Sequence, residues 1–227
     1  MTAKRKTAFR IAGLILLILL IDQLVKVWVK TSFRLGDGVY FTDWFQLLFV
    51  ENNGMAFGWQ FGDKLLLSIF RLVCCVLLVW YIVRMIRRPK GERTSYIYVI
   101  GTTLAGAVGN LIDGTLYGCI FSSSLGRIAS FVPFGSGYSS LFHGKVVDMF
   151  YFPIITNDAG ETLFFDAVFN VADIAVTVSI FLIILFFRKD LNLSLESEKE
   201  RRERLNKESL KADETVSPSG NAAQPTE

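Results

Sequence analysis

Long apolar runs alternate along this chain of 227 residues with short clusters of lysine and arginine. A helix needs about 20 apolar residues to cross a hydrocarbon core about 30 Å thick. Four segments have this length, and they lie at about 9–29, 65–86, 96–116 and 168–187. The pattern therefore predicts an all-α membrane protein with four transmembrane helices.

The basic clusters predict the orientation of these helices, because loops on the cytoplasmic side of a membrane are enriched in Lys and Arg. One cluster precedes the first helix, one separates the second from the third, and one follows the fourth; their residues are Lys4, Arg5, Lys6, Arg10, Arg84, Arg87, Arg88, Lys90, Arg93, Arg188 and Lys189. A four-span protein places all three clusters on one side. We therefore expect both termini in the cytoplasm, with segments 30–64 and 117–167 on the outer side.

The two outer segments differ in character. Val39–Phe41 and Phe45–Val50 are aromatic and β-branched and are bounded by glycines, which is typical of short strands. The stretch 122–144 is rich in Gly and Ser, with apolar islands. We expect a small extracytoplasmic β-sheet from the first segment and an insertion that lies on the membrane surface from the second.

Composition narrows the function. The chain is 52% hydrophobic with a net charge of +3, which gives no reason to expect a nucleic acid partner. Three cysteines without metal spacing, and His143 as the single histidine, give no reason to expect a metal or another cofactor. We assign residues 1–189 to a membrane domain and residues 190–227 to a charged, largely disordered cytoplasmic tail that begins with a short helix.

Carboxylates at membrane depth are costly and mark functional sites. Asp173 lies about 22 Å from Arg188 along a helix, which places it about 7 Å below the outer surface of the hydrocarbon core. Asp113 falls near the same boundary, and Asp148 lies in an apolar outer stretch. Asp148 and Asp173 have no basic partner within one helical turn, so a catalytic role is the stronger hypothesis for both. The alternative is that they are buried structural acids capped by Asn side chains or backbone amides.

Neighbouring residues support this site. Asn110 precedes Asp113 by three residues, and Asn170 precedes Asp173 by three, so each pair shares a helix face. Two carboxylates a few Å apart share one proton and can act as base and acid toward a water molecule. Such a pair could hydrolyse a peptide bond without a metal.

Two basic residues within the apolar runs call for a structural interpretation first. Lys26 stands four residues after Asp22, a spacing that favours a structural ion pair within one helix. Arg71 lies near the outer end of the second helix, where arginines usually extend toward the interface or brace a neighbour.

The chain also resembles a known family. Five motifs occur in order: Asp22-Gln23-x-x-Lys26, Asn52-Asn53-Gly54-Met55-Ala56-Phe57, Gly109-Asn110-Leu111-Ile112-Asp113, Val146-Val147-Asp148 and Phe169-Asn170-Val171-Ala172-Asp173. Together they resemble the motif set of lipoprotein signal peptidase, also called signal peptidase II. The resemblance covers about residues 22–187, and no single motif is as specific as the ordered set.

This resemblance implies an aspartic peptidase of the bacterial cytoplasmic (inner) membrane, with its active site near the extracytoplasmic face. Its substrates would be diacylglyceryl-modified prolipoproteins, cut just before the lipidated cysteine, and globomycin would inhibit it. By motif position, Asp148 and Asp173 would be catalytic, with Asn52, Gly54, Asn110, Asp113 and Asn170 as site-supporting residues. The partners we expect are the prolipoprotein substrates and membrane lipid, and we expect a monomer.

Two features depart from the family pattern. The family usually has Arg directly after Asn-x-x-Asp, where this chain has Gly114; if a cation is needed there, Arg127 or Lys145 could supply it. The stretch between Asp113 and Asp148 is also longer than usual and could act as a lid or a substrate guide.

Two other classes of function stay open. A small proton or ion transporter also buries carboxylates, but it would spread them over the membrane depth on several helices. A non-catalytic membrane scaffold would tolerate Asn at both Asp148 and Asp173.

Overall fold

The computed structural model describes residues 3–56, 59–60, 64–88, 93–157, 162–164 and 166–216. The long helices are α1 (Ala3–Ser32), α2 (Lys64–Arg87), α3 (Thr94–Ile112), α5 (Val171–Phe186), α6 (Arg188–Leu195) and α7 (Glu198–Val216). The π-helix η1 (Asp113–Tyr117) and the short α4 (Gly118–Ile120) continue α3. The strands are β1 (Gly38–Thr42), β2 (Phe45–Asn52), β3 (Met55–Ala56), β4 (Trp59–Gln60), β5 (Val146–Tyr151), β6 (Ile155–Thr156), β7 (Thr162–Phe164) and β8 (Val168–Phe169).

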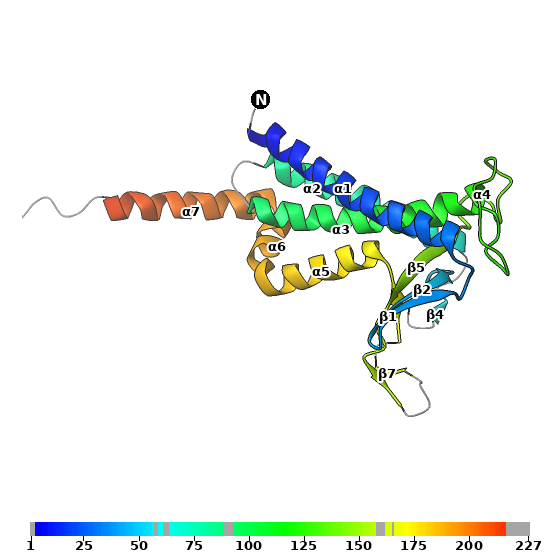
Figure 1. Cartoon of the computed structure of the whole chain (residues 1–227). Helices are drawn as coiled ribbons and strands as arrows, with labels where there is room; N and C mark the ends of the chain where they lie inside the picture. Colours follow the sequence, from blue (N-terminus) through cyan, green and yellow to red (C-terminus); the bar gives the residue numbers. More distant parts are fainter. Residues whose placement is uncertain are drawn as a thin grey trace, which may run out of the picture.

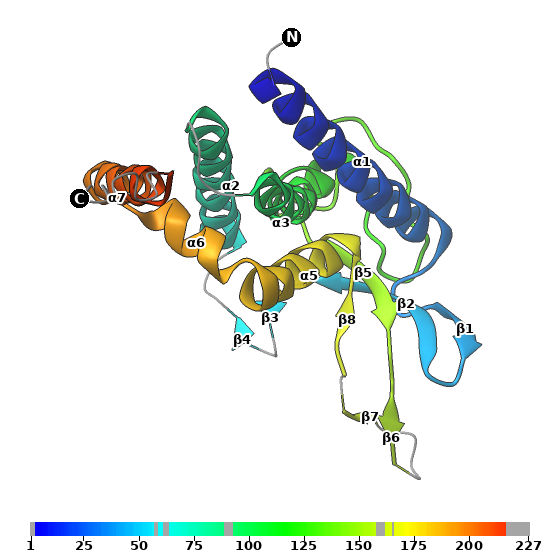
Figure 2. The same ribbon diagram turned by 90° about the vertical axis from the view of Figure 1, so that its left-hand side faces the viewer.

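Helix α3 is the centre of the molecule, with α1, α2 and α5 packed around it (Figure 2). Glycines on α3 permit this close packing: a Cβ at Gly106 would lie 2.4 Å from the Ala172 carbonyl oxygen of α5. A Cβ at Gly109 would lie 2.6 Å from Asp22 Oδ2 of α1. Helices α1 and α5, which carry polar motifs, therefore both approach the backbone of α3 closely.

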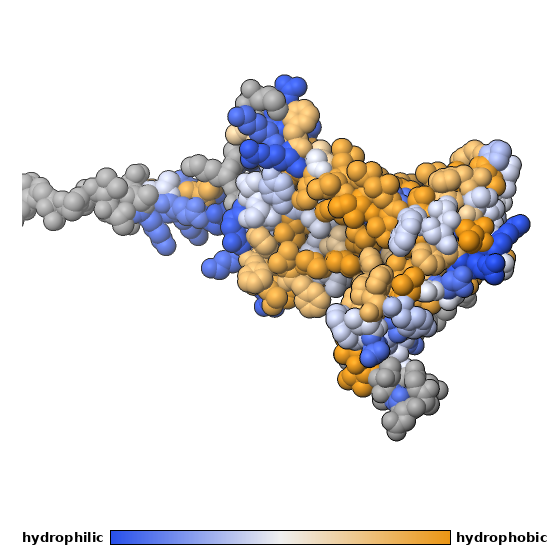
Figure 3. Space-filling view, in the orientation of Figure 1, coloured by the Kyte–Doolittle hydropathy of each residue, from blue (hydrophilic) through white to orange (hydrophobic). Residues whose placement is uncertain are grey.

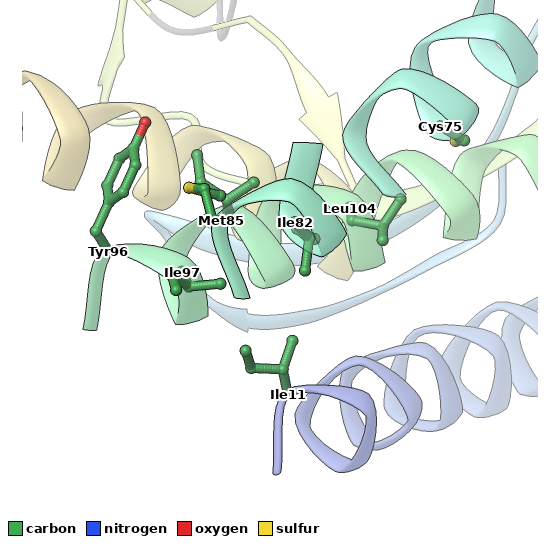
Figure 4. Packing of buried hydrophobic residues seen from close by; sticks show 8 residues of the cluster. Ile11, Cys75, Ile82, Met85, Tyr96, Ile97 and Leu104 are labelled. Atoms are coloured by element: carbon green, nitrogen blue, oxygen red, sulfur yellow. The ribbon is translucent and has the colours of Figure 1, made fainter. Parts of the chain in front are cut away.

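The opposite end of the bundle from the sheet holds an apolar core, in which Ile11, Ile82, Met85, Tyr96 and Leu104 pack together (Figure 4). The outer faces of the helices are apolar as well: Leu16, Leu66, Phe70, Phe181 and Leu185 are each more than half exposed. Figure 3 shows orange, apolar residues over much of the bundle on the side in view, with blue residues toward α7 and the N-terminus. This pattern suits helices that are surrounded by lipid.

Among the described residues, three helices are long and apolar enough to cross a membrane: α1, α2 and the combined stretch Thr94–Ile120. The predicted fourth span, 168–187, needs a correction at its start, because Val168–Phe169 is a strand and Asn170 is the N-cap of α5. The 16 residues of α5 meet the length criterion only together with α6, and the two helices meet at an angle of 90°. The structure therefore gives a mostly helical protein with three or four candidate membrane helices.

The predicted strands at 39–41 and 45–50 are present as β1 and β2, within a four-stranded antiparallel sheet in the order β1-β2-β5-β8. Strands β5 and β8 were not predicted, although Val146–Tyr151 has the β-branched and aromatic composition of a strand. The motif residue Phe57 lies outside the described residues. Figure 1 shows the sheet at one end of the bundle and the N-terminus with α6 and α7 at the other.

The charged tail is more helical than we expected. Ser197 and Glu200 form a capping box, in which Ser197 N donates to Glu200 Oε2 at 2.8 Å and Glu200 N donates to Ser197 Oγ at 3.3 Å. Helix α7 then runs for 19 residues, supported by ion pairs of Arg204 with Glu196 and Glu208. The expected disorder of the last residues, 217–227, lies outside the described part of the chain.

Candidate active site

Asp148 and Asp173 come together where the sheet meets the bundle. Asp148 is on β5, the neighbour of β8, and β8 leads directly into Asn170 and α5. Asp173 is the third residue of α5 and completes a capping box with Asn170: Asp173 N donates to Asn170 Oδ1 at 2.9 Å, and Asn170 N donates to Asp173 Oδ2 at 3.3 Å. The sheet and the helix N-terminus therefore fix the two carboxylates independently.

Two asparagine amides connect the acids. Asn170 Nδ2 donates to Asp148 Oδ1 at 2.6 Å and to Asn110 Oδ1 at 3.2 Å, and Asn110 Nδ2 donates to Asp173 Oδ1 at 2.8 Å. The spacing of both Asn-x-x-Asp motifs thus serves a purpose that helix geometry alone does not predict. Each asparagine contacts a carboxylate from another part of the chain.

Lys26 orients this relay, the chain of hydrogen bonds through Asn170 and Asn110 that joins the two acids. Its Nζ lies 2.9 Å from Asn110 Oδ1, which turns the amide nitrogen of Asn110 toward Asp173. The same ammonium lies 3.0 Å from Asp22 Oδ2 and 2.8 Å from Asp113 Oδ2, so the ion pair expected between Asp22 and Lys26 has a third member. All three charged side chains are at most 1% exposed.

The Asp113 carboxylate is occupied by contacts within the protein. Besides Lys26, its carboxylate accepts from Gln23 Nε2 at 3.0 Å and from the backbone nitrogen of Val147 at 3.2 Å. The bond from Val147 attaches β5 to the end of α3 one residue before Asp148. Asp113 also begins the π-helix η1, an irregularity that is frequent at functional sites.

Asn52 approaches Asp148 from the neighbouring strand. In β2, Val50 is opposite Asp148 and Asn52 is opposite Val146, and the Asn52 side chain hydrogen-bonds to the Asp148 carboxyl. Gly54 holds the other side of Asn52: its backbone nitrogen donates to Asn52 Oδ1 at 2.8 Å, and its φ of +92° is one that L side chains rarely adopt.

Burial changes the acidity of Asp148, which is 2% exposed. Burial and then the charge of Asp173 raise the pKa of Asp148 to about 7, against the hydrogen bonds from Asn52 and Asn170, which act to lower it. Asp148 therefore keeps its proton at a pH where an exposed carboxyl would have lost it. An acid of this kind beside a second carboxylate is typical of a catalytic pair.

The insertion is attached to the sheet by a second buried cluster. Glu51 of β2 binds Lys30 Nζ at 2.5 Å, Lys145 Nζ at 2.9 Å and Ser124 Oγ at 2.8 Å. Burial acts to raise the pKa of Glu51, but the charge of Lys30 and these hydrogen bonds outweigh it and hold the pKa below its usual value.

The cation expected near Gly114 is neither of the two predicted residues. Lys145 is bound to Glu51, and Arg127 Nε donates to the carbonyl oxygen of Ser123 at 3.3 Å. Arg71 of α2 is the cation that lies beside Gly114 instead: a Cβ on Gly114 would be in ordinary contact with Arg71 Nη1, at 3.5 Å. Arg71 is the one charged residue within the apolar run 65–83, a signal that could have identified it from the sequence.

No metal site accompanies the two acids: within the described ranges, no group of three or more His, Cys, Asp and Glu side chains could hold a metal ion. The arrangement is therefore a protonatable acid and a second carboxylate, held by amides at the end of a membrane bundle.

Comparison with known proteins relates this geometry to a family. Residues 14–188 match the family model described as signal peptidase (SPase) II. The lipoprotein signal peptidase of Porphyromonas gingivalis is 41% identical over 199 residues, covering 83% of this chain and 87% of the relative. That of Amoebophilus asiaticus is 31% identical, covering 79% of this chain and 78% of the relative.

Two solved structures titled as bacterial membrane enzymes share the fold. Each has a TM-score of 0.55, with 22% and 23% sequence identity, and they cover 80% and 83% of this chain and 94% and 93% of their own. The match to the family model and the identity to these relatives together show that this chain is a multi-pass membrane protein of the signal peptidase II family, the peptidases that remove signal peptides from prolipoproteins.

Proposed function

We propose that this protein is an intramembrane aspartyl endopeptidase in which Asp148 and Asp173 form the catalytic dyad. Its substrates are diacylglyceryl-modified prolipoproteins, which it cuts just before the lipidated cysteine. The observation that carries this proposal is the closed relay of amide hydrogen bonds from Asp148 through Asn170 and Asn110 to Asp173. Such a relay gives the two acids one fixed geometry and distinct environments.

The two carboxyls have different roles because their surroundings differ. Asp148, with a pKa of about 7, carries the shared proton and donates it to the carbonyl oxygen of the scissile bond. Asp173 lies in the first turn of α5, where a negative charge is favourable. It takes a proton from the attacking water and then passes it to the leaving amine.

The orientation expected from the basic clusters supports the placement of this site. Lys4 Nζ bonds the carbonyl oxygen of Arg87 at 2.7 Å, and Arg93 pairs with Asp190 at 2.8 Å, so all three clusters lie at the end away from the sheet. If that end lies on the cytoplasmic side of a bacterial inner membrane, the dyad lies near the extracytoplasmic face. A substrate anchored by acyl chains in the outer leaflet would reach it laterally.

A gel-shift cleavage assay tests the proposal. Purified protein in detergent receives a diacylglyceryl-modified prolipoprotein, with and without globomycin, and the Asp173→Asn variant is assayed beside it. The matched control is Asp166→Asn, an exposed acid that bonds Tyr151. We expect cleavage by wild type and control, and none with globomycin or by Asp173→Asn. Cleavage by a folded Asp173→Asn variant would overturn the dyad, and a folded wild type without activity would overturn the function.

A further inference from the structure

Arg71 is placed at the site but is not used by the dyad relay. It lies on α2, one helical turn after Ser68, whose hydroxyl donates to the Phe142 carbonyl oxygen at 2.9 Å. This bond fixes α2 against the end of the insertion. The guanidinium then reaches Gly114, where a Cβ would lie 3.3 Å from Ser68 Oγ and 3.5 Å from Arg71 Nη1. The absence of a side chain at Gly114 leaves room for the guanidinium.

The guanidinium interacts electrostatically with the acids but forms no ion pair with them in the described part of the chain. Its strongest electrostatic partners are the carboxylates of Asp173, Asp113 and Asp148, in that order. Within the part of the chain that the structure describes, however, Arg71 donates no hydrogen bond and forms no ion pair. Asp113 is already bound by Lys26, Gln23 and Val147. The five N–H donors of the Arg71 guanidinium thus have no partner among the described residues and are available to a ligand.

The charge balance indicates which ligand fits. Asp22 and Asp113 share the single ammonium of Lys26, and the dyad with one proton carries one further negative charge. Arg71 leaves the cluster with a net charge of −1, so an anionic ligand would be repelled. Neutral carbonyl oxygens accept hydrogen bonds from a guanidinium without adding charge.

We propose that Arg71 is a substrate-binding residue whose guanidinium donates hydrogen bonds to backbone carbonyl oxygens of the precursor peptide beside the scissile bond. This inference rests on the proposed function, which brings an extended peptide to the dyad. Arg71 lies beside the position that a side chain at residue 114 would take, 3.5 Å from where its Cβ would be. An arginine at 114 and Arg71 are therefore alternative sources of one guanidinium at one place.

Binding measured without turnover separates this role from an electrostatic effect on the dyad. In the Asp173→Asn background, the Kd of a diacylglyceryl-modified precursor peptide is measured with Arg71→Leu, Arg71→Lys and Arg127→Leu added. We expect Arg71→Leu to raise the Kd about 10- to 100-fold, as for the loss of a charged hydrogen-bond donor. Arg71→Lys should recover part of it, and Arg127→Leu, an exposed arginine of the insertion, should leave it unchanged. A Kd for Arg71→Leu within twofold of its background overturns the proposal.

A second ligand tells the peptide from the lipid. An ether-linked peptide lacks the ester carbonyls of the diacylglyceryl group, so the Arg71→Leu factor should be the same for both ligands. A factor that disappears with the ether analogue overturns contact with the peptide and assigns Arg71 to the lipid ester.

Relocating the guanidinium completes the test. Cleavage by Gly114→Arg, by Arg71→Leu and by the double variant is compared with that of wild type. We expect both single variants to lose activity and the double variant to exceed each of them, whereas a double variant below both contradicts the shared position. Wild-type cleavage with a normal Arg71→Leu variant refutes this inference alone, while inactivity of the wild type refutes the proposed function.

Discussion

Lys26 gives the sharpest stability prediction, because one buried ammonium neutralises two buried carboxylates. Its Nζ lies 2.8 Å from Asp113, 3.0 Å from Asp22 and 2.9 Å from Asn110 Oδ1. The side chain is fully buried. Lys26→Met keeps most of the volume but removes the charge and the hydrogen bond to Asn110 Oδ1, leaving both acids without their cation.

The expected loss is large. Breaking a buried ion pair by removing one partner costs about 3–5 kcal/mol, and in a protein of this length each kcal/mol shifts the Tm by about 2–4 °C. Lys26→Met should therefore unfold about 6–20 °C below wild type. It should also cleave more slowly, because the Asn110 amide loses the contact that turns its nitrogen toward Asp173.

Thermal unfolding in detergent, followed by intrinsic fluorescence, measures this effect. Lys189→Met, at an exposed position, is the matched control and should stay within about 1 °C of wild type. Adding Asp113→Asn to Lys26→Met removes one of the stranded charges and should restore part of the Tm. A Lys26→Met variant that unfolds within about 2 °C of wild type would mean that Lys26 does not stabilise the two buried acids.

Three further predictions follow from the site. Cleavage should decline as the pH rises through about 7, because Asp148 then loses its proton; a kcat–pH profile that is flat up to pH 9 would contradict the shared proton. The pKa of Asp148 is higher in the folded protein than in the unfolded chain. Burying Asp148 therefore costs the most stability once the pH exceeds about 7, where the unfolded chain has already lost this proton. Asp148→Asn should thus raise the free energy of unfolding at pH 8 by up to about 4 kcal/mol and have little effect near pH 4, as denaturation at the two pH values would measure. Asn170→Ala removes the α5 cap and the 2.6 Å bond to Asp148; the expected result is a loss of about 0.5–2 kcal/mol in stability and a lower kcat, and unchanged values of both would count against the relay.

The sequence predicted the elements whose patterns are local. Apolar length identified the spans of α1, α2 and α3, and β-branched and aromatic residues identified β1 and β2. The start of α5 was placed too early because Val168 and Phe169 are as apolar as the helix that follows; only pairing with Phe150 and Tyr151 makes them a strand. Strand β5 depends on the same non-local pairing.

The sequence singled out the residues of the candidate site but not the hydrogen bonds between them. Asn110, Asn170 and Asp173 stood out by spacing and Asp148 by its lack of a basic neighbour, yet each asparagine contacts the carboxylate of another segment, which no local pattern specifies. Lys26 looked like the partner of Asp22 alone because Asp113 is close only in space. The position of Arg71 beside Gly114 could not be predicted, because it depends on how α2 packs on α3.

The proposed mechanism requires Asp148 and Asp173 to act together on one peptide bond. Single-turnover cleavage by matched Asp→Asn variants measures whether both are needed. Lipid-modified precursor is mixed with excess wild type, Asp148→Asn, Asp173→Asn or the exposed control Asp166→Asn, each first shown to be folded. We expect each dyad variant to lose at least about 10³-fold in rate, while Asp166→Asn matches wild type. A rate within about tenfold of wild type for either Asp148→Asn or Asp173→Asn would contradict it.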